Sequence, residues 1–150
     1  MRSINFLGES YPYNKTILET FINKISQIID MDKFKNRQIV GFVEYAEIFG
    51  NDNKKKKIKA RIDTGAVKSS IDARLAAELH LGPIIKRKLV VSAHGRTLRP
   101  VMEARIKIGR RKMKSEFTIA DRTHMKYKIL VGQNILKEGF LVDPMKKIRR

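Results

Sequence analysis

An aspartate, a threonine and a glycine stand together after a short apolar stretch, in KIKARIDTGA. Apolar and basic residues alternate in IKARI, as in a half-buried strand. Such a strand would carry Asp63 into a tight turn, where Thr64 can hydrogen-bond locally and Gly65 permits close backbone approach. Two carboxylates facing each other can share a proton, so that one activates a water molecule and the other polarises a carbonyl. On the tripeptide alone, an ordinary Asx-type turn is the favoured interpretation.

Other common catalytic patterns are absent from the sequence. It contains no phosphate loop of the Gly-x-x-x-x-Gly-Lys type, no His-Glu-x-x-His and no Gly-x-Ser-x-Gly. The three histidines share no spacing that one helix or strand would bring together, so neither a metal site nor a cofactor is predicted. We expect His80 to be partly buried near a helix C-terminus, and His94 and His124 to lie in loops.

Residues 14–30 have the spacing of an amphipathic helix, with Asn14 as its N-cap. Its polar face is mixed in charge, so docking on the domain's own core or on a second subunit is favoured over membrane association. Residues 33–37, KFKNR, are interpreted as a linker. The sequence therefore predicts a helical extension over residues 1–38 and a main domain over residues 39–150.

From Gln38 onward the pattern changes to short strands separated by polar turns. We expect a hairpin from QIVGFVEYAEIF and KIKARID, then a short helix in SSIDARLAAELHLGP, with Asp72 as its N-cap. Two strand-like arms flank Gly95, and KMKSEFTIADR, YKILVGQNIL and GFLVDP supply further strands and a helical turn. Six or seven strands with two or three helical pieces predict a mainly β, barrel-like domain.

The charge is strongly positive and unevenly distributed. The net charge is +18, of which residues 39–150 carry +16, from 27 basic and 11 acidic residues. Such a field attracts polyanions such as nucleic acid or acidic polypeptides, although any single lysine run is more simply a solvated surface.

The length of 150 residues suits one main domain, and no run of eighteen apolar residues or secretory signal is found. The absence of cysteine agrees with a reducing compartment. We therefore expect a cytoplasmic protein that is not bound to a membrane.

Four ordered motifs make the Asp-Thr-Gly turn more specific: ARIDTGAVKSSID, VVSAHGRTLRPVMEARIKIG, SEFTIADR and YKILVGQNILKEGFLVDP. Together they resemble a retropepsin-type aspartic protease, in the order catalytic turn, flap hairpin and supporting strand. More narrowly, they are similar to the bacterial and archaeal family labelled ATP-dependent zinc proteases. The resemblance covers about residues 39–146. It implies a retropepsin-like closed barrel half with a short helix.

The resemblance implies roles for three groups of residues. Asp63 would be catalytic, Thr64 would brace the two active-site loops and Gly65 would present backbone to the substrate. Supporting residues would be Leu130, Val131 and Gly132, threaded beside the catalytic loop. Substrate-binding residues would lie after the turn and at the flap tip: Ala66, Lys68, Ser92, Ala93, His94, Gly95 and Arg96.

Two departures from the family pattern bear on these expectations. The zinc-protease-labelled relatives often have a histidine where this chain has Asp72, and no residue here supports a role for zinc or ATP. Retropepsins often have acidic residues where this chain has Val67 and Lys68, which should favour acidic substrate side chains. One Asp-Thr-Gly in the chain implies that two subunits supply the carboxylate pair, as a homodimer.

The sequence thus favours a dimeric aspartic endopeptidase acting on polypeptides, with acidic or glutamate-rich segments as candidate substrates. A non-catalytic basic module that binds nucleic acid or ribosomes is the alternative from another class, although few aromatic residues lie among its basic clusters. A metal-dependent peptidase is a third option.

Overall fold

The computed structural model describes residues 3–6, 9–12, 15–28, 32–92 and 95–148. The chain divides into two compact units, Met1–Arg37 and Gln38–Arg150. The first contains the antiparallel strands β1 (Ser3–Phe6) and β2 (Glu9–Pro12) and the helices α1 (Lys15–Ile28) and α2 (Asp32–Lys35).

The first unit confirms one expected element and corrects another. The amphipathic pattern forms α1, but the expected cap Asn14 lies outside the described residues. Part of the stretch interpreted as a linker forms the short helix α2, and the β1–β2 hairpin was not predicted. Among the helices that the structure describes, none is long and apolar enough to cross a membrane.

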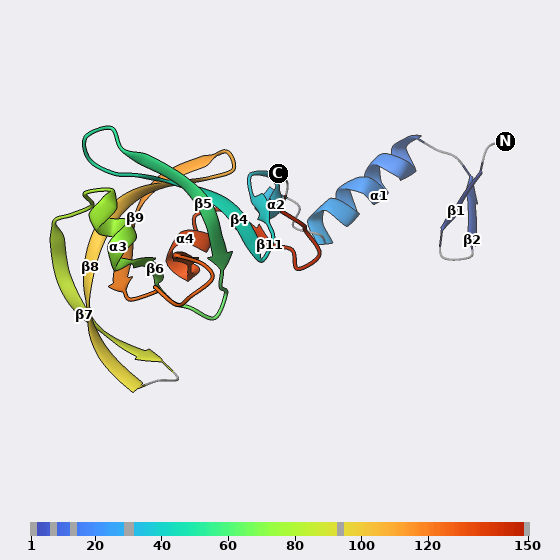
Figure 1. The fold of residues 1–150 in the computed structure, drawn as a ribbon. Coiled ribbons are helices and arrows are strands. Elements are labelled where there is room, and N and C mark those ends of the chain that lie inside the picture. Colours follow the sequence, from blue (N-terminus) through green and yellow to red (C-terminus); the bar gives the residue numbers. More distant parts are fainter. Residues whose placement is uncertain (1–2, 7–8, 13–14, 29–31, 93–94, 149–150) are drawn as a thin grey trace. The chain divides into compact units, whose positions relative to one another are not determined.

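The second unit is built on a closed barrel of six strands (Figure 1). Their order is β4-β5-β10-β6-β9-β8, and pairing of β4 with β8 closes the ring. These strands are β4 (Val43–Phe49), β5 (Lys55–Ile62), β6 (Ser69–Asp72), β8 (Gly95–Ile108), β9 (Arg111–Ala120) and β10 (Ile129–Val131). The expected mainly β, retropepsin-like closed barrel is confirmed.

Three further strands and two short helices complete the second unit. β7 (Ile84–Ser92) pairs with β8 as an antiparallel hairpin that extends away from the barrel in Figure 1. β3 (Gln38–Val40) pairs in parallel with β11 (Phe140–Val142). The helices are α3 (Ala73–Glu78), capped by Asp72 as predicted, and α4 (Gln133–Leu136).

Alternation of side chains positions the barrel core. Along β5 the alternate residues Lys55, Lys57, Lys59 and Arg61 are exposed, while Ala60 and Ile62 are buried. The largest fully buried side chains come from strands all around the ring and from α4: Phe117, Ile48, Ile62, Ile71, Ile106, Ile129 and Ile135. Because β10 lies between β5 and β6 in this core, the loops that follow β5 and β10 emerge together.

The stretch before the helix forms a strand that was not predicted. Ser69–Asp72 is the strand β6, which pairs with β9 on one side and β10 on the other. All four residues are buried, so the strand lacks the alternation by which a half-buried strand is identified. The structure thus has more strands in this unit than the six or seven predicted.

Candidate active site

Asp63 begins the loop that leaves β5. Its backbone N–H donates to the carbonyl of Val131 at 2.9 Å, which joins the loop to β10. Its side-chain Oδ1 accepts hydrogen bonds from the backbone N–H of Gly65 at 2.9 Å and of Ala66 at 3.2 Å. Among the described residues Oδ2 has no hydrogen-bond partner, and Asp63 is partly exposed. One carboxylate oxygen is therefore anchored, and the other can face a ligand.

The junction of β10 and α4 holds the rest of this loop. Gln133 donates from Nε2 to the carbonyl of Thr64 at 2.8 Å and from its backbone N–H to that of Ala66 at 2.8 Å. Gly132 passes so close to the loop that a β-carbon there would lie 2.7 Å from the Ala66 carbonyl oxygen and 2.8 Å from that of Lys68. The loop conformation therefore depends on this glycine.

Gly65 does not have the same requirement within one chain. Its φ lies outside the left-handed region, and a β-carbon would approach only Asp63 Oδ1, at 3.4 Å. The backbone conformation of this chain therefore does not explain a glycine at position 65, contrary to one of the reasons suggested by the sequence. A role in presenting backbone to a substrate stays a prediction.

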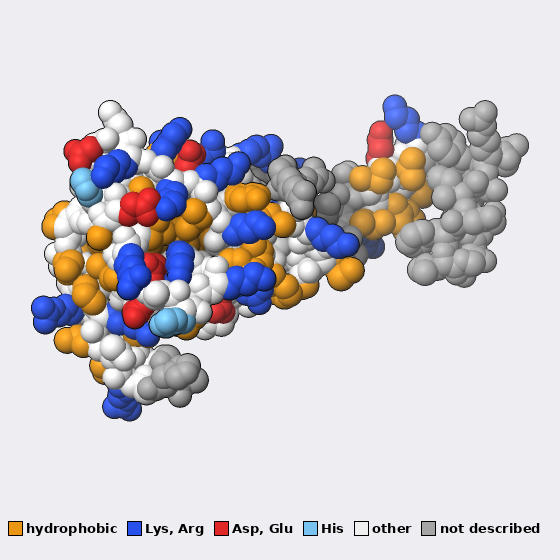
Figure 2. Space-filling view, viewed as in Figure 1, with side chains coloured by type: hydrophobic (Ala, Val, Ile, Leu, Met, Phe, Trp, Pro, Cys, Tyr) orange, Lys and Arg blue, Asp and Glu red, His pale blue; other side chains and the backbone are white. Residues whose placement is uncertain are grey.

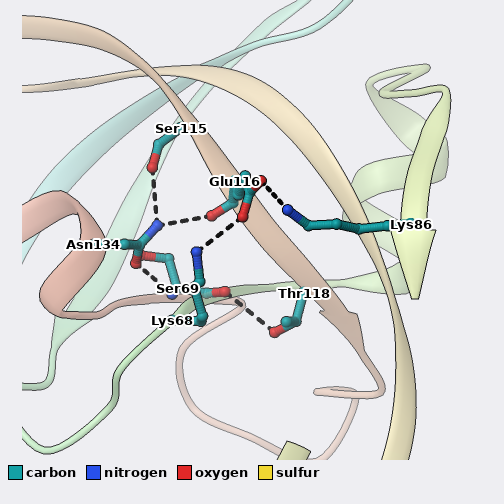
Figure 3. Close-up of polar contacts among 7 residues, drawn as sticks. All are labelled: Lys68, Ser69, Lys86, Ser115, Glu116, Thr118 and Asn134. Atoms are coloured by element: carbon teal, nitrogen blue, oxygen red, sulfur yellow. Dashed lines mark hydrogen bonds and ion pairs between the residues drawn. The ribbon is translucent and has the colours of Figure 1, made fainter. Parts of the chain in front are cut away.

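A partly buried asparagine, Asn134, supports this loop through its side-chain amide (Figure 3). Asn134 Oδ1 accepts from the backbone N–H of Ser69 at 2.7 Å and from its hydroxyl at 2.9 Å, while Nδ2 donates to Ser115 Oγ and to the carbonyl of Glu116, both at 2.9 Å. Ser69 Oγ in turn accepts from the backbone N–H of Gly132 at 2.9 Å. The network uses the side-chain donors and acceptors of both Asn134 and Ser69, so it ties α4 to β6 and β9.

Lys68 does not stand alone beside the loop. Its Nζ lies 2.9 Å from Glu116 Oε2, and the same carboxylate also contacts Lys86 Nζ (Figure 3). These two ion pairs, that of Lys86 first, lower the pKa of Glu116 from 4.5 to about 2. Glu116 thus links the loop after Asp63 to β7, a role that the sequence did not predict.

We expect the Glu116→Gln variant to be about 1 kcal/mol less stable than the wild type at pH 7, because it loses the ion pairs with Lys68 and Lys86. The loss is small because these side chains are partly exposed. Since folding lowers this pKa, the stability contributed by Glu116 is present above pH 4.5 and is lost as the pH falls towards 2. Urea unfolding at pH 7 and pH 2.5 measures the difference between wild type and variant, which should shrink at the lower pH.

Glu103→Gln is the matched control, since Glu103 pairs with one lysine, Lys114, and is more exposed. Its effect at pH 7 should be smaller. An equal wild-type-to-variant difference at both pH values for Glu116→Gln would show that the ion pairs contribute nothing.

A cavity of about 490 Å³ lies beside the loop that follows Asp63. It is bordered by Gly65–Lys68, by Lys88–Val91 of β7, and by Ser70, Arg99, Thr118, Arg122 and Leu130. Four of these side chains are cationic and none is acidic. Basic side chains are also spread over the face seen in Figure 2, between apolar ones. The cavity therefore favours an anionic or polar ligand over a purely apolar one.

The predicted site residues fall into two groups in the structure. The loop residues Ala66 and Lys68 and the supporting Leu130 line the cavity, and Val131 is buried beside it. Of the hairpin, the residues that line the cavity are the β7 arm and Arg99 rather than Ser92, Gly95 and Arg96 at its end. Ala93 and His94 lie outside the described residues.

The structure contradicts the expectation for His80 and confirms that for His124. His80 is exposed rather than partly buried, with Nδ1 3.0 Å from Asp52 Oδ2 and Nε2 2.9 Å from Lys54 Nζ. His124 lies in an exposed loop, as expected. Asp72 is 3% exposed and accepts from three backbone N–H groups, those of Arg74, Leu75 and Arg122. In the described part of the chain, no three His, Cys, Asp or Glu residues gather as metal ligands.

Solved structures with the same fold define the class of protein. Lpg0085, a protein of unknown function (DUF785) from Legionella pneumophila subsp. pneumophila str. Philadelphia 1, gives a TM-score of 0.51 at 24% identity, over 73% of this chain and 95% of that one. EIAV protease complexed with the inhibitor HBY-793 gives 0.52 at 20% identity, over 69% and 88%. The barrel is therefore of the retropepsin-like class.

Residues 76–150, half of the chain, match the family described as RimB-like, retropepsin-like aspartic endopeptidase RimB. The chain belongs to this family, and the resemblance to retropepsin-type proteases is thereby confirmed. The match begins after Asp63, so it covers the β7–β8 hairpin, β10 and α4 but not the Asp-Thr-Gly loop. No curated protein matches the chain. Fold and family support a peptidase.

Proposed function

We propose that the protein is a homodimeric aspartic endopeptidase whose active site contains Asp63 from each of two subunits. The observation that carries this proposal is the geometry of Asp63: one oxygen is held by two backbone amides, the other is without a partner among the described residues, and a cavity adjoins the loop. The sequence contains one Asp-Thr-Gly, so a second carboxylate comes from a second copy.

The reaction follows from two carboxylates that share one proton. A water molecule between them loses a proton to the ionised Asp63 as its oxygen attacks the scissile carbonyl carbon, while the protonated Asp63 donates to the carbonyl oxygen. When the tetrahedral intermediate collapses, the carbon–nitrogen bond breaks, the leaving nitrogen takes the proton that the first Asp63 received from water, and a hydroxyl of the intermediate returns its proton to the other Asp63. Thr64 would brace the two loops, and Gly65 would offer its backbone to the substrate.

The β7–β8 hairpin would act as the flap over the substrate. An extended peptide can bind along its edge as an additional strand, with Ala66, Lys68 and the hairpin end, residues 92–96, in contact with it. Closure would exclude bulk water from the carboxylates. Large apolar side chains on the hairpin are exposed, namely Leu89, Val91 and Leu98, and they are available for such a closure.

Acidic or glutamate-rich polypeptides are the substrates that we propose. The cationic lining of the cavity and the net charge of +16 in residues 39–150 both support this choice, because they attract and orient negatively charged chains. The narrower resemblance to proteins labelled ATP-dependent zinc proteases stays a sequence-based prediction.

The test incubates the wild-type protein with a mixed peptide library that includes glutamate-rich peptides and their glutamine counterparts. Mass spectrometry then identifies new termini, with and without a chelator. We expect cleavage within the peptides, enriched beside acidic residues and unchanged by the chelator. Loss of all cleavage on chelation would indicate a metal-dependent peptidase. No cleavage, together with salt-sensitive RNA binding, would indicate a basic binding module instead.

A further inference from the structure

The four cationic side chains of the cavity differ in what already neutralises them. Lys68 Nζ forms an ion pair with Glu116 Oε2 at 2.9 Å, and this carboxylate neutralises its charge. Lys88 is exposed, so water screens it. Arg99 and Arg122 are partly buried, and no ion pair of the described residues includes either of them. The unneutralised charge of the cavity is therefore carried by the two arginines.

Arg122 is held in one orientation. Its backbone N–H donates to Asp72 Oδ2 at 2.8 Å, its Nε donates to the carbonyl of Tyr127 at 2.9 Å, and its Nη1 donates to Ser70 Oγ at 3.1 Å. Within the described residues Nη2 has no acceptor. A planar guanidinium fixed at two nitrogens presents its remaining N–H groups in a defined direction, as recognition of a carboxylate requires.

The surroundings of Arg122 leave its charge uncompensated. Burial, and then the nearby Arg99, lower its pKa, while Asp72 and Asp63 act in the opposite direction. The Asp72 carboxylate accepts hydrogen bonds from backbone N–H groups of α3 and of Arg122 itself, and it makes no hydrogen bond to the guanidinium. A partly desolvated cation without a direct anionic partner is costly, and a bound carboxylate would offset that cost.

We propose that the Arg122 guanidinium binds a carboxylate of the substrate in this cavity, beside Leu130 and the catalytic loop. This inference rests on the proposed function and assigns its acidic preference to one residue. Arg99 adds a second positive charge, and the Ser70 hydroxyl can rotate to donate to the same carboxylate. The carboxylate can belong to a glutamate or aspartate side chain or to a peptide C-terminus.

The experiment compares kcat/KM for peptide pairs that differ only in Glu or Gln at one position, with free or amidated C-termini. The variants are Arg122→Gln and Arg122→Lys, and the control is Arg105→Gln, whose exposed side chain lies on β8 outside this cavity. The Glu-to-Gln ratio does not depend on the amount of folded enzyme, so it separates recognition from stability.

We expect the wild type to prefer Glu, and Arg122→Gln to lower the Glu-to-Gln ratio by roughly ten-fold or more, the effect of one charge-assisted hydrogen bond. Arg122→Lys, which keeps the charge, should lower the ratio less, and it supplies the readout if Arg122→Gln does not fold. Arg105→Gln should leave the ratio unchanged. If Arg122→Gln instead lowers the ratio of kcat/KM for free over amidated C-termini and leaves the Glu-to-Gln ratio unchanged, the recognised carboxylate is the terminal one.

Two outcomes would overturn the inference alone: a wild type that prefers neither Glu over Gln nor a free over an amidated C-terminus, or Arg122 variants that keep the wild-type value of both ratios. In either case cleavage itself continues and the proposed function stands. A wild type that cleaves neither peptide of any pair would overturn both.

Discussion

Replacement of Asp63 by asparagine is expected to lower kcat/KM for peptide hydrolysis by about 1,000-fold or more, with the fold retained. Asparagine has the same shape, and its side-chain oxygen can still accept from the backbone N–H groups of Gly65 and Ala66. It cannot accept the proton of the attacking water. The change should therefore appear in catalysis rather than in stability, which we expect to alter by about 1 kcal/mol at most.

Asp143→Asn is the matched control for this variant. Asp143 Oδ1 accepts from the backbone N–H of Met145 at 2.8 Å, so it makes the same kind of local turn as Asp63 but is not followed by residues that line the cavity. Its kcat/KM should equal that of the wild type. Identical cleavage products at similar rates from wild type and Asp63→Asn would rule out the aspartic protease mechanism.

Replacement of Gly132 by alanine is expected to lower the free energy of unfolding by about 3 kcal/mol, because overpacking against backbone atoms cannot be relieved by a side-chain rotation. The added methyl group would lie 2.7 Å from the carbonyl oxygen of Ala66 and 2.8 Å from that of Lys68. To make room, the loop after Asp63 or the start of α4 must move. Peptide hydrolysis should fall as well, since a shift of the loop displaces Asp63.

Urea unfolding followed by circular dichroism measures this effect, with Gly65→Ala as the control. A β-carbon at position 65 would approach only Asp63 Oδ1, at 3.4 Å, so that variant should lose less than about 1 kcal/mol. A Gly132→Ala protein as stable as the wild type would show that the loop after Asp63 moves away from position 132 without loss of stability.

Local patterns were sufficient to predict most elements of the second unit. The alternation in β5 and the turn before it predict the β4–β5 hairpin, and Asp72 caps α3 as expected. β6 was missed because it is buried on both faces between β9 and β10, so two serines and an aspartate appear where a strand pattern needs alternation. The serine side chains are satisfied by residues that the sequence pattern does not bring together, such as Asn134 and Arg122.

The residues of the candidate site also divide into those that were expected from the sequence and those that were not. The expectation that Val131 and Gly132 support the loop after Asp63 came from the resemblance of the ordered motifs to retropepsin-type proteases, and both residues contact that loop in the structure. The partners of the cationic residues could not be predicted: Glu116 lies 48 residues from Lys68, and only the pairing of β6 with β9 brings them together. The Asn of VGQNIL, within an apolar stretch, is a local signal that could have indicated a polar network, since an amide withdrawn from water requires partners.

Subunit mixing tests most directly the central claim, that one active site uses Asp63 from two chains. Wild type and Asp63→Asn are mixed at constant total protein, allowed to exchange subunits, and assayed for peptide hydrolysis. Random pairing in an equal mixture leaves about a quarter of the dimers with two Asp63 carboxylates, so the activity should fall to about a quarter of that of the wild type. A fall to about a half, in proportion to the wild-type fraction, would mean that each chain acts by itself and would contradict the account.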